Sequence, residues 1–568
     1  MINNLKILVL VLGIFSLSSC EDFFDTVPDD RIELNDLNDL AELVTNAYPK
    51  GSYLFLEGMT DNFGAVPSNR QLTQMEEAFN WETISIEGQD TPTYYWSNAY
   101  NAIAHANQAL KSLEHIKGDE NRKKAIRGEA LLCRAYAHFM LVNIFAKHYD
   151  ATTAGSDLGV PYIKDPEMNL IVNYKRETVE VTYQYIEEDM LEGMALVSNE
   201  FYKNTGKYHF TREAALAFAS RLYLYKADYP QCLNYSRQLL GKTYNANFIK
   251  DYKEVLEGQG PKGRAQVFCS PDDQSNLMII RKKLGYQLYY QFGYRMTQGI
   301  AGTLYIGDAR SKNMWAAGAD QSAVYQSKLE PLVKRASLTS SSGLPYTVQP
   351  VFRGEEVFFN MLESEKKIAD SETDKASQIV LDDKLKAMIN DFTVDRYNGP
   401  LTPPKNDDPS RMDPKTYFFY VFADNVYRAK FPVTFPDHRK NKKYPKYISD
   451  KSTLDPNDMI ENPDHDPEFV IWADEEMRID DREILDLLIA EERRREFAEE
   501  GLRWFDIKRL KLEITHTNLA GDKKTLTAND PRKVIQIPLA AIANGIEENE
   551  INVPAEVESK LIRIKSQL

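Results

Sequence analysis

Two long segments with helical periodicity, joined by one short polar turn, restrict the possible folds of this chain more than any other feature. In TYYWSNAYNAIAHANQALKSLEHI (93–116), the residues near one helical face are Tyr100, Ile103, Ala104, Ala106, Leu110 and Leu113. The turn KGDEN leads into RKKAIRGEALLCRAYAHFMLVNIFAKHY (122–149), which is rich in alanine, leucine and aromatic residues. Ala130, Ala135 and Ala137 are small enough for a neighbouring helix to approach closely. These segments predict an antiparallel helical hairpin.

The alternation of helix and turn continues further along the chain. Residues 178–197 and 211–227 predict a second hairpin, with Thr211 as the N-cap of its second helix. DYPQCLNYSRQLL (228–240) predicts another helix, and 353–392 another hairpin. The repeats are degenerate, so the residues alone predict helical hairpins and leave open a tetratricopeptide geometry with its period of about 34 residues.

Two stretches lack helical periodicity. Gly, Ser, Thr and aromatic residues dominate 258–350, which we interpret as an irregular, loop-rich insertion, and 398–470 is rich in Pro, Asp and Lys, as in long surface loops. We expect these loops to separate parts of one domain, 31–568, rather than two domains. The prediction is a mostly α fold with its helical scaffold at about 94–257, 353–392 and 480–510.

The stretch DDREILDLLIAEERRREFAEEGLRWFDIKRL (480–510) predicts a helix with one apolar stripe, followed by a short amphipathic turn. Gly501 suits the left-handed residue that ends a helix. Glu491 with Arg494, and Glu492 with Arg495, stand one turn apart, and we expect them to pair across the solvent face. Trp504, like Trp96 in the first hairpin, is expected to pack in the core.

Charge and cysteine content exclude some classes of function. The net charge of −16 argues against nucleic acid as a main partner, because phosphate binding needs a positive face. The four cysteines are widely spaced and form no metal or catalytic motif. Cys133 and Cys232 fall in helical patterns, where a thiol usually behaves as a small buried apolar group.

The first residues have the pattern of a secretion signal. MINNLKILVLVLGIFSLSSC has one lysine, an apolar run too short to span a bilayer, and small residues, so 1–19 are predicted to be a signal peptide. LSSC resembles a bacterial lipobox, in which Cys20 becomes the acylated N-terminus, and 20–30 would be the lipidated tether. Ordinary cleavage nearby, with Cys20 a free thiol, is the alternative.

No motif for catalysis stands out. The chain has 85 acidic residues, and any two of them could serve as the acid and nucleophile of a glycosidase. No flanking sequence pattern marks a particular pair. There is no H-E-x-x-H, G-x-S-x-G or Walker sequence. An acidic loop could hold calcium but lacks the EF-hand spacing, and its residues are Asp455, Asp458, Asp464 and Asp466. We predict no enzyme activity, no cofactor and no metal site.

Several motifs resemble the SusD/RagB family, the surface nutrient-binding lipoproteins of Bacteroidetes. They are C-x-D-F-F-D at 20–25, RGEALLCRAYAHFMLVNIFAK at 127–147, Asp308-Ala309-Arg310, R-x-x-E-V at 353–357, ERRREFAEEGLRWFDIKRL at 492–510 and VIQIPLAAIANGI at 534–546. The resemblance follows the family's order along nearly all of the chain. It implies a tetratricopeptide-containing helical fold and an outer-membrane, cell-surface lipoprotein. It also implies an oligosaccharide ligand and a SusC-like TonB-dependent transporter as partner.

Candidate ligand-binding residues are aromatic side chains in loop-like segments, because flat rings pack on the C–H faces of sugars. In the family the glycan site lies where the segment before the hairpins meets the central insertion. The candidates are Trp81, Tyr289, Tyr290, Tyr294 and Trp315, with Asp61, Asn69 and Arg70 as polar partners. A Trp81→Ala substitution is expected to weaken glycan binding without unfolding the protein.

Three other functions remain open. A RagB-like peptide-uptake protein would keep the same anchor and fold, a surface glycoside hydrolase would use a carboxylate pair, and a structural scaffold would bind no ligand. The sequence does not identify the glycan, because specificity depends on the spacing and tilt of rings.

Overall fold

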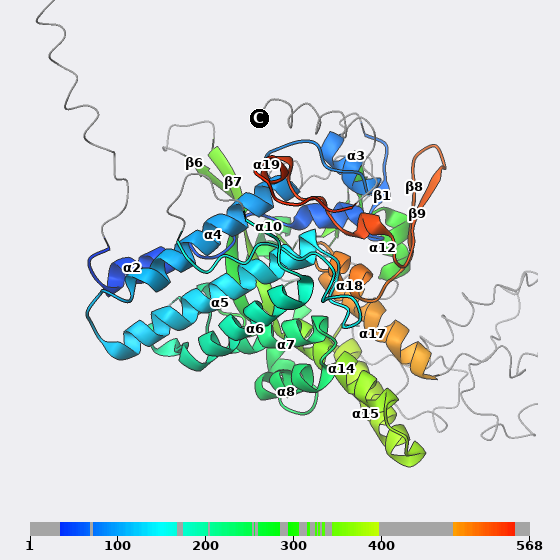
Figure 1. Ribbon diagram of the computed structural model, residues 1–568. Coiled ribbons are helices and arrows are strands. Elements are labelled where there is room, and N and C mark those ends of the chain that lie inside the picture. Colours follow the sequence, from blue (N-terminus) through cyan, green and yellow to red (C-terminus); the bar gives the residue numbers. More distant parts are fainter. Residues whose placement is uncertain are drawn as a thin grey trace, which may run out of the picture.

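Paired helices form the larger part of the protein in the computed structural model. It describes residues 34–68, 72–166, 174–202, 205–252, 255, 260–284, 293–305, 315–317, 324–326, 328–329, 332–335, 343–396 and 481–550. α4 (Pro92–Ser112) and α5 (Glu120–Phe145) form the first predicted hairpin, and α6 (Val179–Leu196) packs along α5 (Figure 1). Thr91, Asp119 and Thr178 cap these helices by accepting backbone N–H groups. The first predicted hairpin is therefore confirmed.

The next helices follow the sequence prediction equally well. α7 (Arg212–Tyr225) packs on α8 (Tyr229–Leu240), and α14 (Gly354–Asp370) packs against both and continues into α15 (Lys375–Arg396). The Thr211 hydroxyl accepts a hydrogen bond from the Ala214 N–H at 3.2 Å, which confirms the predicted N-cap. The mostly α fold class is thus confirmed.

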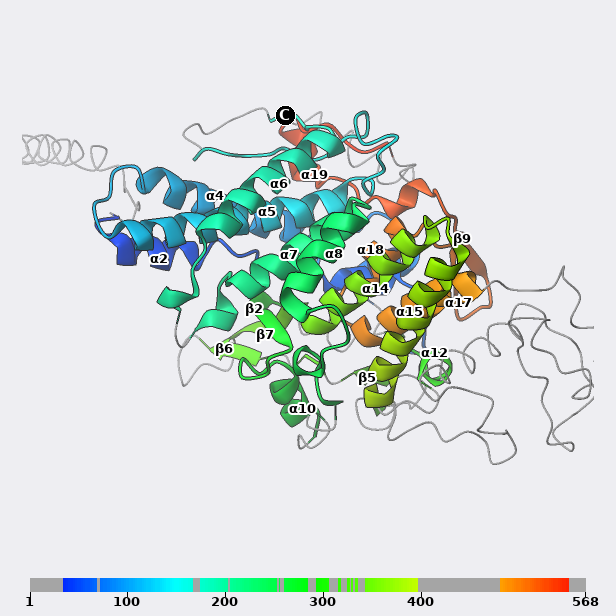
Figure 2. The same cartoon turned by 90° about the horizontal axis from the view of Figure 1, so that it is seen from below.

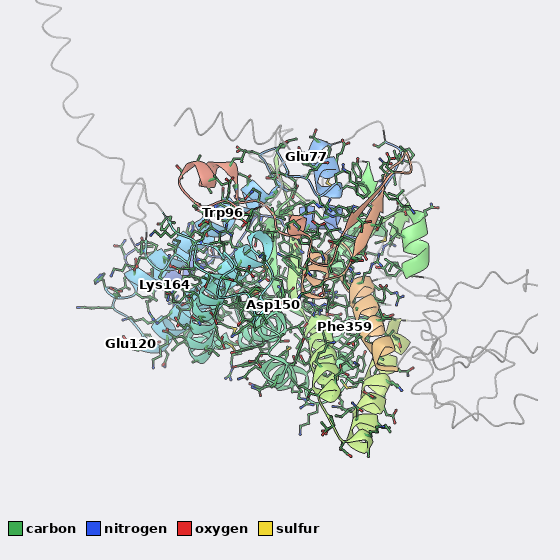
Figure 3. The ribbon with its side chains drawn as sticks, turned by 45° about the vertical axis from the view of Figure 1, so that its right-hand side comes forward. Glu77, Trp96, Glu120, Asp150, Lys164 and Phe359 are labelled. Atoms are coloured by element: carbon green, nitrogen blue, oxygen red, sulfur yellow. The ribbon has the colours of Figure 1, made fainter. Side chains whose placement is uncertain are left out.

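The helices enclose one extended core. From Gly128 onward every residue of α5 is buried, and Cys133 and Cys232 lie in the core as expected. Trp96, labelled in Figure 3, packs edge-on against Phe145 with ring centroids 4.9 Å apart. Trp504 is fully buried. Both tryptophans are therefore core residues, as the sequence indicated.

A three-stranded antiparallel sheet lies within the stretch expected to be irregular. Its strands are β2 (Asn276–Lys283), β7 (Gly343–Arg353) and β6 (Leu332–Arg335), in the order β2-β7-β6 (Figure 2). The first five residues of β2 are all buried, so this part has none of the alternation that reveals a half-exposed strand. This is why the sequence prediction missed the sheet.

Short elements fill the spaces around these helices and strands. Before α4 come α2 (Leu37–Val44), η1 (Leu54–Met59), β1 (Gly64–Ala65) and α3 (Thr73–Phe79). Between α6 and β2 lie η2 (Asn199–Phe201), η3 (Gly206–Tyr208), η4 (Ala246–Phe248) and α10 (Gly260–Phe268). Between β2 and β6 lie β3 (Tyr294–Arg295), α12 (Gln298–Leu304), β4 (Trp315–Ala317) and β5 (Val324–Gln326). The pairs β1–β3 and β4–β5 are antiparallel.

The C-terminal part returns to the core. It comprises α17 (Asp481–Phe497), α18 (Arg503–Arg509), the β8–β9 hairpin (Ile514–Thr517 and Lys523–Leu526), η11 (Pro531–Lys533) and α19 (Leu539–Ala543). Gly501 has the predicted left-handed φ, +80°, but it does not directly end the helix, because α17 ends at Phe497. A Cβ at this position would lie 2.6 Å from Cδ2 of Tyr53, so the close approach of the N-terminal segment also requires glycine.

The charged face of α17 points into the protein. The predicted pairs are present, with Arg494 3.6 Å from Glu491 and Arg495 bonded to Glu492. Their predicted position on a solvent face is wrong for the second pair, because Glu492 is fully buried and Arg495 is largely covered. Helical spacing shows which charges share a face, but it does not show what covers that face.

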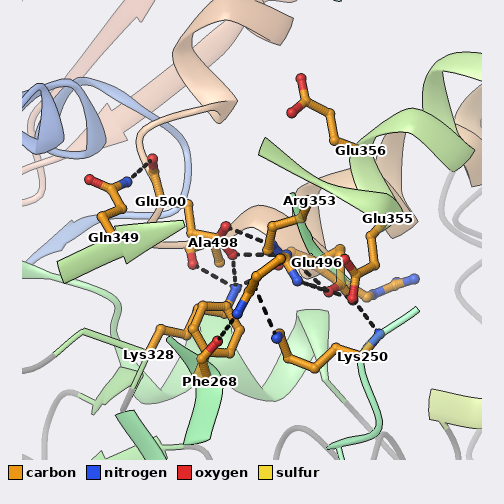
Figure 4. Close-up of polar contacts among 12 residues, drawn as sticks. Lys250, Phe268, Lys328, Gln349, Arg353, Glu355, Glu356, Glu496, Ala498 and Glu500 are labelled. Atoms are coloured by element: carbon orange, nitrogen blue, oxygen red, sulfur yellow. Dashed lines mark hydrogen bonds and ion pairs between the residues drawn. The ribbon is translucent and has the colours of Figure 1, made fainter. Parts of the chain in front are cut away.

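A network of buried charges connects α17 to β7 and α14 (Figure 4). The Arg353 guanidinium donates to Glu496 at 3.0 Å and to Glu500 at 3.0–3.1 Å. Arg396 donates to the other Glu496 oxygen at 3.0 Å, and the Lys328 ammonium donates to Glu500 at 2.6 Å. All five side chains are at most 3% exposed. Each of these buried charges is therefore paired with an opposite charge of the network and not with water.

No helix among the described residues is both long enough and apolar enough to span a membrane.

Candidate functional site

Three of the predicted ligand-binding residues lie in one region of the described structure. This region, here called the early-loop layer, consists of η1, β1 and α3 packed against β3, α18 and β8 (Figure 1). Asp61 follows η1, Trp81 follows α3, and Tyr294 begins β3. The fold thus brings the segment before the hairpins against part of the central insertion, where the family resemblance places a glycan site.

Asp61 is the acceptor of two arginines from the C-terminal part of the chain. Arg503 donates to its two oxygens at 2.8 and 2.9 Å, and Arg494 lies 3.3 Å away. Burial raises the pKa of Asp61, but the two arginines lower it by more, so its pKa lies below the usual value. Asp61 is therefore a carboxylate whose charge is already paired, and it fixes the loop after η1 to α17 and α18.

Glu57, on η1, is a buried acid beside this ion pair. Its Oε1 accepts the Gly501 N–H at 2.6 Å. Burial raises the pKa of Glu57 to about 7, although the bonds from Gly501 and Asn62 act in the opposite direction. Glu57 is therefore largely protonated in mildly acidic solution and must become a buried carboxylate above pH 7.

A Glu57→Gln variant is expected to gain stability relative to the wild type as pH rises. Because the folded pKa lies above the unfolded value of about 4.5, the wild type loses stability from roughly pH 4.5 up to pH 7. The substituted amide keeps an oxygen acceptor for Gly501 but has no proton to lose, so the difference should grow to at most about 3 kcal/mol. Urea unfolding at pH 5 and pH 8 measures it. A pH-independent difference would contradict this reasoning.

Trp81 lies in a packed aromatic cluster. The ring is only 4% exposed, its Nε1–H donates to the Met59 carbonyl at 2.8 Å, and it stacks on His516 of β8 at 4.3 Å. His516 also stacks on Phe79 at 4.2 Å. The backbone of Trp81 has a φ of +56°, which is unusual for a bulky side chain. Little of this ring is available to a ligand.

Both ring nitrogens of His516 lie within hydrogen-bond distance of a carbonyl oxygen in a neighbouring segment. Its Nδ1 lies 2.6 Å from the Phe79 carbonyl oxygen and its Nε2 lies 2.8 Å from that of Thr60. Burial lowers the pKa of His516, while the two carbonyl acceptors and Asp61 act in the other direction. The imidazole thereby ties β8 to the loops after η1 and α3.

The remaining candidates are placed as follows. Tyr294 is largely buried, pairs with Ala65 across β1–β3, and has its ring 4.8 Å from that of Phe79. The backbone of Trp315 pairs with Gln326 in the β4–β5 hairpin. Outside the described residues lie Cys20, Asn69, Arg70, Tyr289 and Tyr290, as do Asp308-Ala309-Arg310 and the acidic loop with Asp455, Asp458, Asp464 and Asp466. In the described ranges, no group of three or more His, Cys, Asp or Glu side chains is placed to hold a metal ion.

A second surface, here called the basic-aromatic edge, lies where the chain before η1 meets β2. It consists of Lys50, Tyr94, Arg281, Lys283 and Tyr346. The Lys283 N–H donates to the Lys50 carbonyl at 2.6 Å. The Arg281 guanidinium carbon lies 3.9 Å from the Tyr346 ring centroid, and the Lys283 ammonium lies 5.8 Å from that of Tyr94. Arg281 and Lys283 are exposed, and the other three are partly exposed.

Sequence reasoning did not select this edge. The run Arg281-Lys282-Lys283 is visible in the sequence, but its strand was not predicted, so the outward direction of the first and third residues was not evident. Lys50 and Tyr94 approach it only through tertiary contacts. A short basic run next to a buried apolar run was the only available signal.

Comparison with known proteins defines the class of this chain. Among solved structures, it matches a SusD superfamily protein from Bacteroides thetaiotaomicron with a TM-score of 0.58 at 16% identity, covering 90% of this chain and 99% of that one. A SusD superfamily protein from Bacteroides vulgatus gives a TM-score of 0.59 at 17% identity, covering 92% and 100%. A structure described as a laminarin binding SusD-like protein gives 0.55 at 15% identity, covering 91% and 97%. The fold is therefore that of the SusD superfamily.

Sequence comparison also finds similarity to SusD-like proteins. The SusD-like family model described as "Starch-binding associating with outer membrane" matches residues 22–224. A 51-residue segment is 39% identical to SusD-like protein P2 of Formosa agariphila, covering 9% of this chain and a tenth of that protein's length. Residues 22–224 thus match a SusD-like family whose model is described as associating with the outer membrane, and about nine-tenths of the chain shares the fold of SusD superfamily structures.

Proposed function

We propose that this protein captures oligosaccharides at the cell surface and delivers them to a SusC-like TonB-dependent transporter of the outer membrane. In this proposal acylated Cys20 anchors the chain to the membrane, and the protein performs no chemistry on the sugar. The observation that supports it most is the agreement of the fold, over about nine-tenths of the chain, with SusD superfamily structures that include a laminarin binding protein.

The architecture suits capture without catalysis. The early-loop layer is fixed by an ion pair to α18 and by ring stacking and a side-chain hydrogen bond to β8, and the basic-aromatic edge is fixed by the β2–β7 pairing. A preformed surface of this kind loses little conformational entropy on binding. We propose that the ligand is held where these N-terminal segments meet the 258–350 stretch, which includes the predicted Tyr289 and Tyr290.

Calorimetry on the full chain with separate pools of neutral oligosaccharides, acidic oligosaccharides and peptides tests the proposal. Saturable binding to oligosaccharides, with no release of reducing ends on incubation with polysaccharide, is the expected result. Binding to peptides alone would instead favour peptide uptake, and release of reducing ends would favour a hydrolase. Mass spectrometry of the mature N-terminal peptide tests the acylation of Cys20.

A further inference from the structure

The basic-aromatic edge concentrates positive charge in an otherwise acidic protein. The chain has a net charge of −16, yet no carboxylate of the described residues forms an ion pair with Lys50, Arg281 or Lys283. Lys50 donates instead to the Asn46 side chain at 2.6 Å. Burial, together with the like charges of Lys283 and Arg281, lowers the pKa of Lys50. Lys283 and Arg281 therefore lie close enough to Lys50 for their charges to repel it.

The fold, and not side-chain flexibility, holds the cations together. β2 pairs with β7 so that Arg281 stands opposite Val348 and Lys283 opposite Tyr346. Between them Lys282 points inward, and its ammonium donates to the Pro49 carbonyl at 2.7 Å. Alternation along the strand thus directs Arg281 and Lys283 to the same outer face, about 7 Å apart along the backbone.

The Lys50 segment is fixed by an equally close contact. Gly51 forms a parallel bridge with Lys283, and a Cβ on Gly51 would lie 3.1 Å from Cα of Tyr95 on α4. This close contact with α4 lets the Lys50 carbonyl accept the Lys283 N–H and brings the ring of Tyr94, one residue before Tyr95, beside the Lys283 ammonium. Three separate segments therefore meet at one partly exposed surface.

We propose that the basic-aromatic edge binds acidic oligosaccharides, whose carboxylate or sulfate groups pair with Lys283, Arg281 and Lys50. Tyr94 and Tyr346 would offer ring faces to the C–H surface of the sugar. An anion would offset the repulsion that Lys283 and Arg281 exert on Lys50 and would form charge-assisted hydrogen bonds with the three cations. This inference rests on the proposed function and narrows its ligand to a chemical class.

Calorimetry with three probes tests the inference: tetragalacturonate, a sulfated galactose tetrasaccharide and neutral galactotetraose, each at 50 and 300 mM NaCl. The wild type should bind at least one acidic probe about tenfold more tightly than the neutral one at low salt, and this preference should shrink at high salt. The carboxylate and sulfate probes distinguish the two sources of negative charge.

Two variants and a control identify the surface. Lys283→Gln should weaken binding of the acidic probe about fivefold without changing the unfolding midpoint, because the side chain is exposed. Tyr346→Ala should weaken binding of acidic and neutral probes alike. Lys111→Gln removes the same charge near the other end of α4, about 25 Å from Tyr94, and should change nothing.

The inference and the proposed function can fail separately. Equal affinity for acidic and neutral probes, or equal loss with Lys283→Gln and Lys111→Gln, would overturn the inference and leave oligosaccharide capture intact. Binding of peptides with no binding of any sugar pool would overturn both.

Discussion

Replacing Arg353 with methionine is expected to lower the free energy of unfolding by about 3–5 kcal/mol. Arg353 is fully buried and donates four hydrogen bonds to the carboxylates of Glu496 and Glu500. Methionine fills a similar volume but leaves the two buried carboxylates with fewer positive partners. Removing one member of a buried ion network is costly for this reason, although replacing the whole network with apolar residues often is not.

Urea unfolding of matched variants measures this effect. Arg127→Met is the control, because Arg127 pairs with Glu192 on the surface, where both side chains are nearly half exposed. Loss of that pair should cost less than about 1 kcal/mol. Equal stability of the Arg353 and Arg127 variants would show that the network in Figure 4 contributes little.

The same network shows where sequence reasoning fails. The helices were predictable because their caps and apolar stripes are local, as Thr211 and the 122–149 segment illustrate. The environment of α17 was not predictable from the sequence, because the partners of its acidic residues come from distant segments. Glu496 and Glu500 pair with Arg353, Arg396 and Lys328. From sequence alone, a helix with interspersed acidic and basic residues is predicted to face solvent, because the sequence does not show which segments pack against it.

The candidate site was predictable to a similar extent. The sequence indicated Asp61, Trp81 and Tyr294, and the fold places them in one layer. It could not indicate that Asp61 is paired by Arg503 or that Trp81 is covered by His516, because these contacts join opposite ends of the chain. A tryptophan in a loop-like segment is as readily covered by a distant strand as exposed to a ligand.

The burial of Trp81 changes the expected result of its substitution. Trp81→Ala should lower the free energy of unfolding by about 3–5 kcal/mol, because it removes a ring that is 4% exposed and leaves a cavity beside His516. It also removes the Nε1–H donor to Met59. We therefore no longer expect this substitution to leave folding unaffected. Any loss of oligosaccharide binding must be measured under conditions in which the variant is fully folded.

Trp81→Phe separates the two roles of this residue. Phenylalanine keeps a ring against His516 and loses the indole donor, so it should cost less than the alanine change. Urea unfolding gives the loss of stability, and calorimetry in the folded range gives the affinity for the oligosaccharide bound by the wild type. If Trp81 serves mainly to hold the early-loop layer together, the folded Trp81→Phe protein keeps wild-type affinity. A stable Trp81→Phe protein that no longer binds would instead place the indole in the ligand site, as the sequence first suggested.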